Sequence, residues 1–179
     1  MQIAIDGTAS SGKGTLSKRL SKKFNIPYLD TGLLYRKVAY TFINNYGQNL
    51  NLNKKESLEK ILHIAENSLS FELDELKLRD NEVSLFASKI ASIFELREIL
   101  KIEQIKFAKT NSEKYGGCIL DGRDIGTIIL PNAEIKFFVI ASPEIRAKRR
   151  LLENFSTSLH PSEQKDMFKK MLKEIILIF

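Results

Sequence analysis

Residues 3 to 15 read Ile3-Ala4-Ile5-Asp6-Gly7-Thr8-Ala9-Ser10-Ser11-Gly12-Lys13-Gly14-Thr15. The first three of these residues are apolar, which predicts a short buried strand. From Lys13 to Phe24 the apolar residues recur every four positions, and this spacing predicts a helix. A buried strand followed by a glycine-rich loop and a helix is the usual opening unit of a parallel α/β sheet.

The loop from Gly7 to Thr15 has the composition and spacing of a phosphate-binding loop. Glycines allow the backbone N–H groups to curl closely around an anion, and the positive end of the following helix points at it. Lys13 adds a mobile full charge that can follow a transferring phosphoryl group. We therefore expect all nine residues to contact ATP, and Lys13 to act in catalysis. The alternative is a Gly/Ser-rich turn without a ligand.

One position departs from the general phosphate-loop pattern. Gly14 stands where a Ser or Thr hydroxyl usually meets Mg²⁺, and Thr15 follows it. The resulting Gly-Lys-Gly-Thr string resembles that of the nucleoside monophosphate kinases. This resemblance implies that Mg²⁺ is held by phosphate oxygens and water, with help from a carboxylate.

Further strands are predicted at Tyr28–Asp30, Cys118–Leu120 and Ile135–Ile140, with Phe137 and Phe138 in the core. Helices are predicted from Thr31 to about Asn44 and from about Leu96 to Gly116, and two basic helices are predicted after Pro143.

Between residues 50 and 87 the pattern changes. A helix near 56–67 precedes segments 69–73 and 76–78, which alternate apolar and polar residues, and the turn signal Asp80-Asn81. This alternation predicts a small antiparallel insert.

The composition excludes several classes of protein. The 179 residues, of which 43% are hydrophobic and 28% charged, suit one globular domain, and no apolar run approaches the roughly 20 residues of a membrane span. A single cysteine, Cys118, cannot form an internal disulfide, and with no secretion signal this favours the cytoplasm. The net charge of +6 favours anionic partners. We expect no nucleic-acid or membrane partner, a monomer, and no metal-binding role for His63 or His160.

Two polar clusters follow predicted strands and point to a phosphorylated acceptor. They run from Asp30 to Arg36 and from Asp121 to Thr127. Ligands of open α/β sheets bind beyond the carboxyl ends of the strands, so both clusters and the phosphate loop should face one crevice. Arg36 and Arg123 can grip phosphate through paired hydrogen bonds. The guanine-reading pattern of GTPases is absent, because Asn53-Lys54-Lys55-Glu56 carries the wrong carboxylate and follows no buried strand.

Taken together, these motifs closely resemble the bacterial cytidylate (CMP) kinases. The resemblance covers residues 1 to about 174 and rests on five segments. These are Ile5-Asp6-Gly7, Leu29-Asp30-Thr31-Gly32 with Tyr35-Arg36, Ala87-Ser88-Lys89-Ile90-Ala91 with Arg97-Glu98, Asp121-Gly122-Arg123-Asp124-Ile125-Gly126-Thr127, and Arg146-Ala147-Lys148-Arg149-Arg150. The implied fold is a three-layer α/β/α phosphate-loop domain with a parallel sheet and a small antiparallel insert, over residues 50–87, that binds the nucleoside monophosphate.

The resemblance also implies roles for individual residues. ATP would donate its γ-phosphoryl group to CMP or dCMP in the presence of Mg²⁺, with Arg36 and Arg123 holding the acceptor phosphate. Thr31, Ser88, Arg97 and Asp124 would read the cytosine, since a carboxylate and a guanidinium match its amino donor and its acceptors. Asp121 resembles a carboxylate that positions Mg²⁺-bound water, and the alternative is a strand-end turn. Lys148, Arg149 and Arg150 either approach ATP or form a solvated basic helix face.

The end of the chain departs from the family. The resemblance implies that an arginine-rich lid, of which residues 143–174 are an incomplete part, and a last strand should follow Glu174, whereas the chain ends Ile175-Ile176-Leu177-Ile178-Phe179. We therefore expect a truncated product with nucleotide binding but weak or absent turnover, and one uncovered sheet edge. Alternatively, apolar residues from Met167 to Ile176 continue one amphipathic helix. Another phosphate-loop small-molecule kinase, and a non-catalytic nucleotide-binding protein, remain alternative functions.

Overall fold

The computed structural model describes residues 1–48, 54–67, 74–155, 166–169 and 172. Its elements follow the order β1 (Gln2–Gly7), α1 (Lys13–Phe24), β2 (Tyr28–Asp30), α2 (Thr31–Tyr46), α3 (Lys55–Asn67), α4 (Glu75–Leu78), α5 (Asn81–Ile90), α6 (Phe94–Tyr115), β3 (Cys118–Gly122), η1 (Ile125–Ile129), β4 (Ile135–Val139) and α7 (Pro143–Phe155). The four strands form one parallel sheet in the order β2-β3-β1-β4. The predicted mixed α/β fold with a parallel sheet is confirmed.

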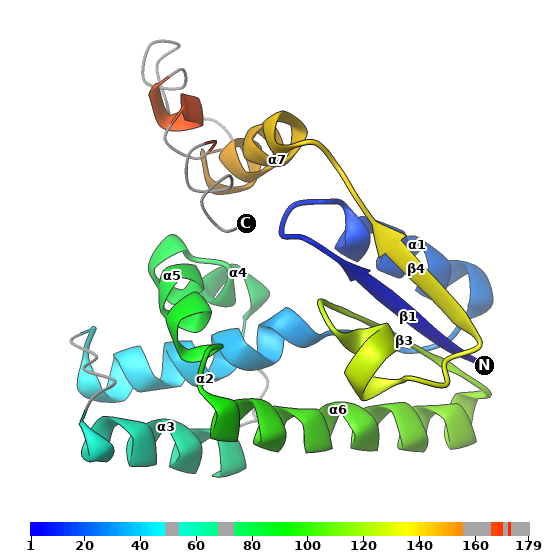
Figure 1. Cartoon of the computed structure of the whole chain (residues 1–179), viewed down its shortest axis with the longest axis horizontal. Coiled ribbons are helices and arrows are strands. Elements are labelled where there is room, and N and C mark those ends of the chain that lie inside the picture. Colours follow the sequence, from blue (N-terminus) through cyan, green and yellow to red (C-terminus); the bar gives the residue numbers. More distant parts are fainter. Residues whose placement is uncertain (49–53, 68–73, 156–165, 170–171, 173–179) are drawn as a thin grey trace.

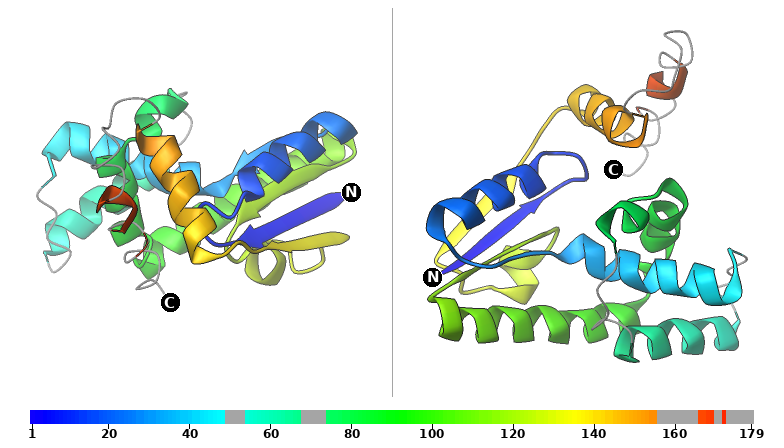
Figure 2. Two further views of the ribbon diagram at one scale, coloured as in Figure 1. Left: turned by 90° about the horizontal axis from the view of Figure 1, so that it is seen from above. Right: turned by 180° about the vertical axis from the view of Figure 1, so that it is seen from behind.

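The sheet lies between two helical layers (Figures 1 and 2). On β1 the side chains of Ile3 and Ile5 pack with Leu16 and Leu20 of α1. Ala4, which lies between them, packs on the opposite face with a cluster that includes residues of η1 and α6. Successive residues of a strand point to opposite faces, so the continuous apolar run of β1 fills both layers.

The crossover between β2 and β3 is long and helical. It consists of α2, a helical insert that comprises α3, α4 and α5, and the 22-residue helix α6. Buried residues of all these elements except α4 form one apolar cluster, to which Val38, Ile61, Phe86 and Leu100 belong. This cluster anchors the insert to α2 and α6, beside the sheet (Figure 1).

The structure contradicts the predicted antiparallel insert over residues 76–85. Residues 75–78 and 81–90 are helical, and each helix is capped by an aspartate. Asp74 accepts a hydrogen bond from the Leu76 N–H, and Asp80 accepts one from the Glu82 N–H. These side chains satisfy N–H groups that a helix start leaves unpaired, which stabilises helix over strand. The predicted strand at residues 69–73 lies outside the described residues.

A second expectation that proves wrong concerns β4. Phe138 is 71% exposed and Phe137 39% exposed, so this pair does not belong to the core. The reason is topological, because among the described strands β4 pairs only with β1 and thus lies at an edge of the sheet.

Near the C-terminus, Met167, Phe168 and Leu172 pack against Ala147 of α7. The rest of the predicted amphipathic helix up to Ile176, and His160, lie outside the described residues.

Gly7 is expected to tolerate no side chain. A Cβ atom there would lie 2.3 Å from the Val139 carbonyl oxygen, at a φ of +154°. We predict that Gly7→Ala lowers the free energy of unfolding by about 3 kcal/mol or more, since backbone must move to accept the methyl group. Gly116→Ala is the control. Gly116 also has a positive φ, +74°, but open space around it, so only the strain of about 1 kcal/mol applies. Urea unfolding measures both, and equal losses would contradict the steric argument.

Candidate active site

The predicted phosphate loop joins the end of β1 to the start of α1. Gly12 caps α1 with a φ of 103° and no side chain bonds the first N–H groups of the helix. The Ser11 hydroxyl is buried, and no described group forms a hydrogen bond with it. Unpaired donors at a helix start are suited to an anion. The Arg149 guanidinium of α7 donates a hydrogen bond to the Ser11 carbonyl at 2.7 Å. Arg149 therefore contacts the loop itself and is not part of a purely solvated face.

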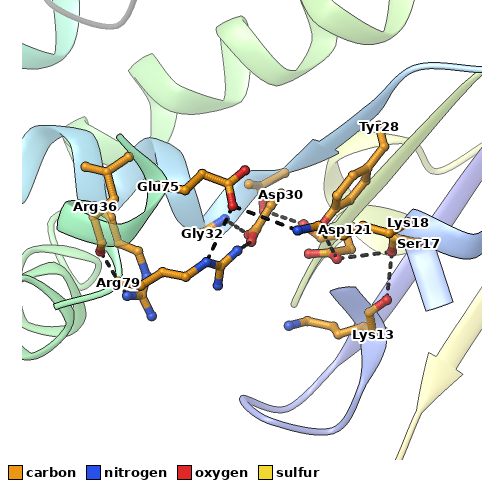
Figure 3. Close-up of polar contacts among 12 residues, drawn as sticks. Lys13, Ser17, Lys18, Tyr28, Asp30, Gly32, Arg36, Glu75, Arg79 and Asp121 are labelled. Atoms are coloured by element: carbon orange, nitrogen blue, oxygen red, sulfur yellow. Dashed lines mark hydrogen bonds and ion pairs between the residues drawn. The ribbon is translucent and has the colours of Figure 1, made fainter. Parts of the chain in front are cut away.

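Asp121, the last but one residue of β3, lies close to the start of α1 (Figure 3). Its Oδ2 accepts a hydrogen bond from the Tyr28 hydroxyl at 2.8 Å and lies 3.1 Å from the Ser17 hydroxyl. Burial raises the pKa of the Asp121 carboxyl, and the nearby Asp30 carboxylate raises it further, whereas Lys13 lowers it. Burial likewise raises the pKa of Tyr28, so its hydroxyl stays protonated and acts as the hydrogen-bond donor to Asp121.

The surroundings of Asp121 fit a hydrated Mg²⁺. A Cβ atom on Gly14 would lie 3.7 Å from the Asp121 Oδ2, so the missing side chain leaves this carboxylate next to the loop. Carboxylate oxygens and water are the ligands that this ion prefers. In the described part of the chain, no group of three or more His, Cys, Asp or Glu side chains is arranged to hold a metal ion.

The raised pKa of Asp121 predicts a pH-dependent gain in stability for Asp121→Asn. A carboxyl whose pKa is raised by folding costs stability once it ionises. This cost disappears as pH falls from the raised pKa of the folded state to the ordinary pKa of the unfolded state. We expect the variant to unfold at higher urea than the wild type at pH 7–8, with the difference shrinking toward pH 4. Glu134→Gln is the control of opposite sign, because a hydrogen bond from the Gln2 N–H holds the pKa of Glu134 below its usual range. A less stable Asp121→Asn at pH 8 would contradict the assignment.

Thr31 and Arg36, both predicted to bind the acceptor, are held by protein groups. The Thr31 hydroxyl, on a side chain only 5% exposed, donates to the Asp121 carbonyl at 2.7 Å. It therefore ties α2 to β3. The Arg36 guanidinium donates to the Leu78 carbonyl at 3.0 Å and to the Ser84 hydroxyl at 2.6 Å. Arg36 thus joins α2 to the insert.

Ion pairs also connect the insert to the edge of the sheet (Figure 3). Arg79, just after α4, lies 3.0 Å from the Asp30 carboxylate at the end of β2. Arg79 also lies 3.7 Å from Glu75, which in turn lies 3.8 Å from Lys18 of α1. These residues line a cavity of about 190 Å³ next to Tyr28. Nothing in the sequence singled out Arg79 or Glu75.

The structure brings together two of the predicted cytosine-reading residues. Arg97 of α6 and Asp124, which follows β3, form an ion pair with 2.6 Å between Nη2 and Oδ2. Both side chains are partly exposed, and their charges act on the adjacent Tyr35 hydroxyl, whose pKa is raised mainly by burial. Ser88 of α5 is exposed, and no hydrogen bond or ion pair in the described structure joins it to this pair.

Arg123 precedes Asp124 and is exposed. It forms no hydrogen bond or ion pair with any described residue, and so its guanidinium is available at the carboxyl edge of the sheet. The carboxyl ends of the strands carry the phosphate loop after β1, Asp30 as the last residue of β2 and the Arg123-Asp124 segment after β3. All three segments therefore lie at the carboxyl ends of neighbouring parallel strands, as predicted. Helices of membrane-spanning length and hydrophobicity do not occur among the described residues.

Comparisons of the sequence with a family model and with curated proteins point to the same family. A sequence model of the cytidylate kinase family matches residues 3–176. A cytidylate kinase of Acidiphilium cryptum is 45% identical over 159 residues, which are 89% of this chain and 70% of that protein. The cytidylate kinase of Methylocella silvestris is 45% identical over 153 residues, or 86% and 66% of the two chains. That of Streptococcus pneumoniae is 39% identical over 173 residues, or 89% and 73%. The chain thus spans 66–73% of the length of these relatives.

Proposed function

The chain belongs to the cytidylate kinase family, and on this basis we propose that it transfers the γ-phosphoryl group of ATP to CMP or dCMP, giving CDP or dCDP. The observation that carries the proposal is that both groups of residues lie at the carboxyl ends of neighbouring parallel strands. The phosphate loop with Lys13 follows β1, and Asp124, which pairs with Arg97 of α6, follows the adjacent strand β3, so the two substrates can meet between them.

In this proposal the phosphate loop, Gly7 to Thr15, holds the phosphates of ATP. The N–H groups at the start of α1 and the Ser11 hydroxyl, which lack protein partners in the described structure, would donate to phosphate oxygens. Lys13 would follow the γ-phosphoryl group as it moves and neutralise its charge. No covalent intermediate is required, because alignment and charge neutralisation supply the catalysis.

The acceptor phosphate would be held by Arg36 and Arg123. Arg36 already bonds the insert, so gripping the phosphate and positioning the insert are coupled. We propose that residues 50–87 form the insert that covers the monophosphate, and that residues 143–174 form part of a lid over ATP. Contact between Arg149 and the phosphate loop supports the second assignment.

The cytosine would be read by Arg97 and Asp124, with Thr31 and Ser88 as further contacts. Asp121 would hold Mg²⁺ through water, and the ion would neutralise charge on the phosphates. Burial of Asp121 with two hydroxyl partners fixes its carboxylate for this task. We place this activity in the cytoplasm and in a monomer, with nucleotides as the partners.

The test is a panel of acceptors with ATP and Mg²⁺. Purified chain is mixed with CMP, dCMP, UMP or AMP, or with shikimate or dephospho-coenzyme A. Both phosphorylation and thermal protection are measured, with Lys13→Ala as the control. We expect CMP and dCMP to be phosphorylated and to protect the protein, and UMP and AMP to do neither. Phosphorylation of a different acceptor, such as shikimate or dephospho-coenzyme A, would instead assign another kinase activity. ATP binding without any acceptor would indicate a non-catalytic protein.

A further inference from the structure

Asp6 is a buried carboxylate to which the proposed function gives no task. It is the residue before Gly7 in β1 and is 8% exposed. Its Oδ1 accepts a hydrogen bond from the Ile125 N–H, and its Oδ2 accepts one from the Gly126 N–H, each at 2.8 Å. A carboxylate that accepts two backbone N–H bonds in a buried place forms a strong contact, since charge-assisted hydrogen bonds are the stronger kind.

The two N–H groups are those that η1 cannot satisfy itself. Within η1 the N–H groups of Ile128 and Ile129 donate to the Asp124 carbonyl, so the first N–H groups of the turn have no partner inside it. Asp6 supplies that partner from another strand, 119 residues earlier in the chain. It thus caps η1 in the way that an N-cap aspartate does, and its negative charge lies at the positive end of the turn.

This contact fixes the segment that begins with Asp124. The Asp124 carbonyl accepts hydrogen bonds from two N–H groups of η1. The next two N–H groups along the chain, those of Ile125 and Gly126, donate to Asp6. With its backbone held on both sides, the Asp124 side chain points at Arg97 with 2.6 Å between the charged atoms. Because Asp6 also leads directly into the phosphate loop, one side chain connects the ATP side of the crevice to the cytosine side.

We propose that Asp6 is a positioning residue for nucleobase selection, which holds the Asp124 segment in the conformation that distinguishes CMP from UMP. This inference rests on the proposed function, since it assumes that Asp124 reads the base. Asp6 itself touches neither substrate and acts through residues 124–126.

The test compares Asp6→Asn with two controls by calorimetric titration of CMP, UMP and ATP into the full chain. Asparagine keeps the shape of the side chain but turns an N–H donor toward one of the two backbone donors, so one hydrogen bond is lost and a repulsion is added. We expect the ratio of CMP to UMP affinity to fall at least about 10-fold, in line with the loss of one good polar recognition contact. Affinity for ATP should change by less than about 3-fold, a difference of under 1 kcal/mol.

The controls separate positioning from stability. Glu134→Gln makes the same chemical change to an exposed carboxylate that also accepts a backbone N–H, from Gln2. Ile3→Val removes a methylene from a fully buried residue of the same strand, and costs stability without touching residues 124–126. Both controls should keep the wild-type ratio of CMP to UMP affinity. An unchanged ratio in Asp6→Asn, or an equal loss in Ile3→Val, would overturn the proposal.

Two further measurements cover the remaining outcomes. Should Asp6→Asn not fold, Gly126→Ala disturbs the same contact from the other side, because its Cβ would lie 3.2 Å from the Asp6 Oδ2. A lowered ratio is expected there too, and an unchanged one would overturn the proposal. Amide hydrogen exchange at Ile125 and Gly126 should be faster in Asp6→Asn. A wild-type chain with no preference for CMP would defeat the proposed function, while the exchange rates would still report whether Asp6 holds the segment.

Discussion

Replacing Lys13 by alanine is expected to lower the rate of phosphoryl transfer from ATP to CMP by about 10²- to 10³-fold, the usual effect of removing one group that stabilises transition-state charge. Lys13 is the first residue of α1, and its charge lowers the pKa of the Asp121 carboxyl. Its ammonium can therefore reach a phosphate bound at the helix start. A single-turnover assay, with the chain in excess over ATP, measures the chemical step directly.

Lys22→Ala is the matched control for Lys13→Ala. Lys22 lies in the last turn of the same helix and is exposed, so its removal changes the net charge equally but leaves the loop intact. We expect a rate within about 2-fold of the wild type, since single exposed charges away from a site contribute little. A Lys13→Ala rate as high as that of Lys22→Ala would remove Lys13 from the catalytic machinery.

Replacing Asp124 by asparagine is expected to lower the preference for CMP over UMP by about 10- to 100-fold, the range that one good bidentate contact to a base provides. Cytosine presents an amino donor where uracil presents a carbonyl oxygen. A carboxylate accepts from the first and repels the second, whereas an amide can rotate to match either one. The variant also leaves the Arg97 guanidinium without its 2.6 Å partner, so affinity for CMP should fall as well.

The measurement is the ratio of kcat/KM for CMP to that for UMP. Glu98→Gln serves as the control, because Glu98 is exposed, follows Arg97 directly and pairs with Lys101 at 3.7 Å. This change removes a carboxylate near Arg97 but not the one that faces it. We expect Glu98→Gln to keep the wild-type ratio. The same ratio in Asp124→Asn as in the wild type would assign cytosine recognition to other residues.

Local signals predicted the sheet and the strand–loop–helix unit at residues 2–24 well. The predicted α1 has the observed bounds, because its amphipathic spacing and the glycine before it agree. The insert was predicted wrongly, because three residues of alternating polarity, at 76–78, fit a short helix as well as a strand. The better signal was Asp74 and Asp80, each placed where an aspartate can cap a helix.

Contacts between distant parts of the chain were beyond sequence reasoning. Nothing local indicates that Asp6 bonds the N–H groups of residues 125 and 126, or that Tyr28 donates to Asp121, which lies 93 residues away. The one available signal was the charge itself, since an aspartate at the end of an apolar strand requires a partner when buried. The exposure of Phe138 could not be predicted from the sequence either, because a run of apolar residues does not show whether its strand lies at an edge of the sheet.

The pleat of the sheet directs the two buried carboxylates Asp6 and Asp121 to opposite faces. Asp121 points toward α1, where Ser17 and Lys13 lie, whereas Asp6 points to the opposite layer and bonds η1. With the roles proposed above, Asp121 would hold the metal on the α1 face of the sheet, whereas Asp6 would support nucleobase selection from the opposite face. Apolar substitutions in β1 and β3 preserve this arrangement. A one-residue insertion or deletion in either strand would turn the carboxylate of that strand, Asp6 or Asp121, to the wrong face of the sheet.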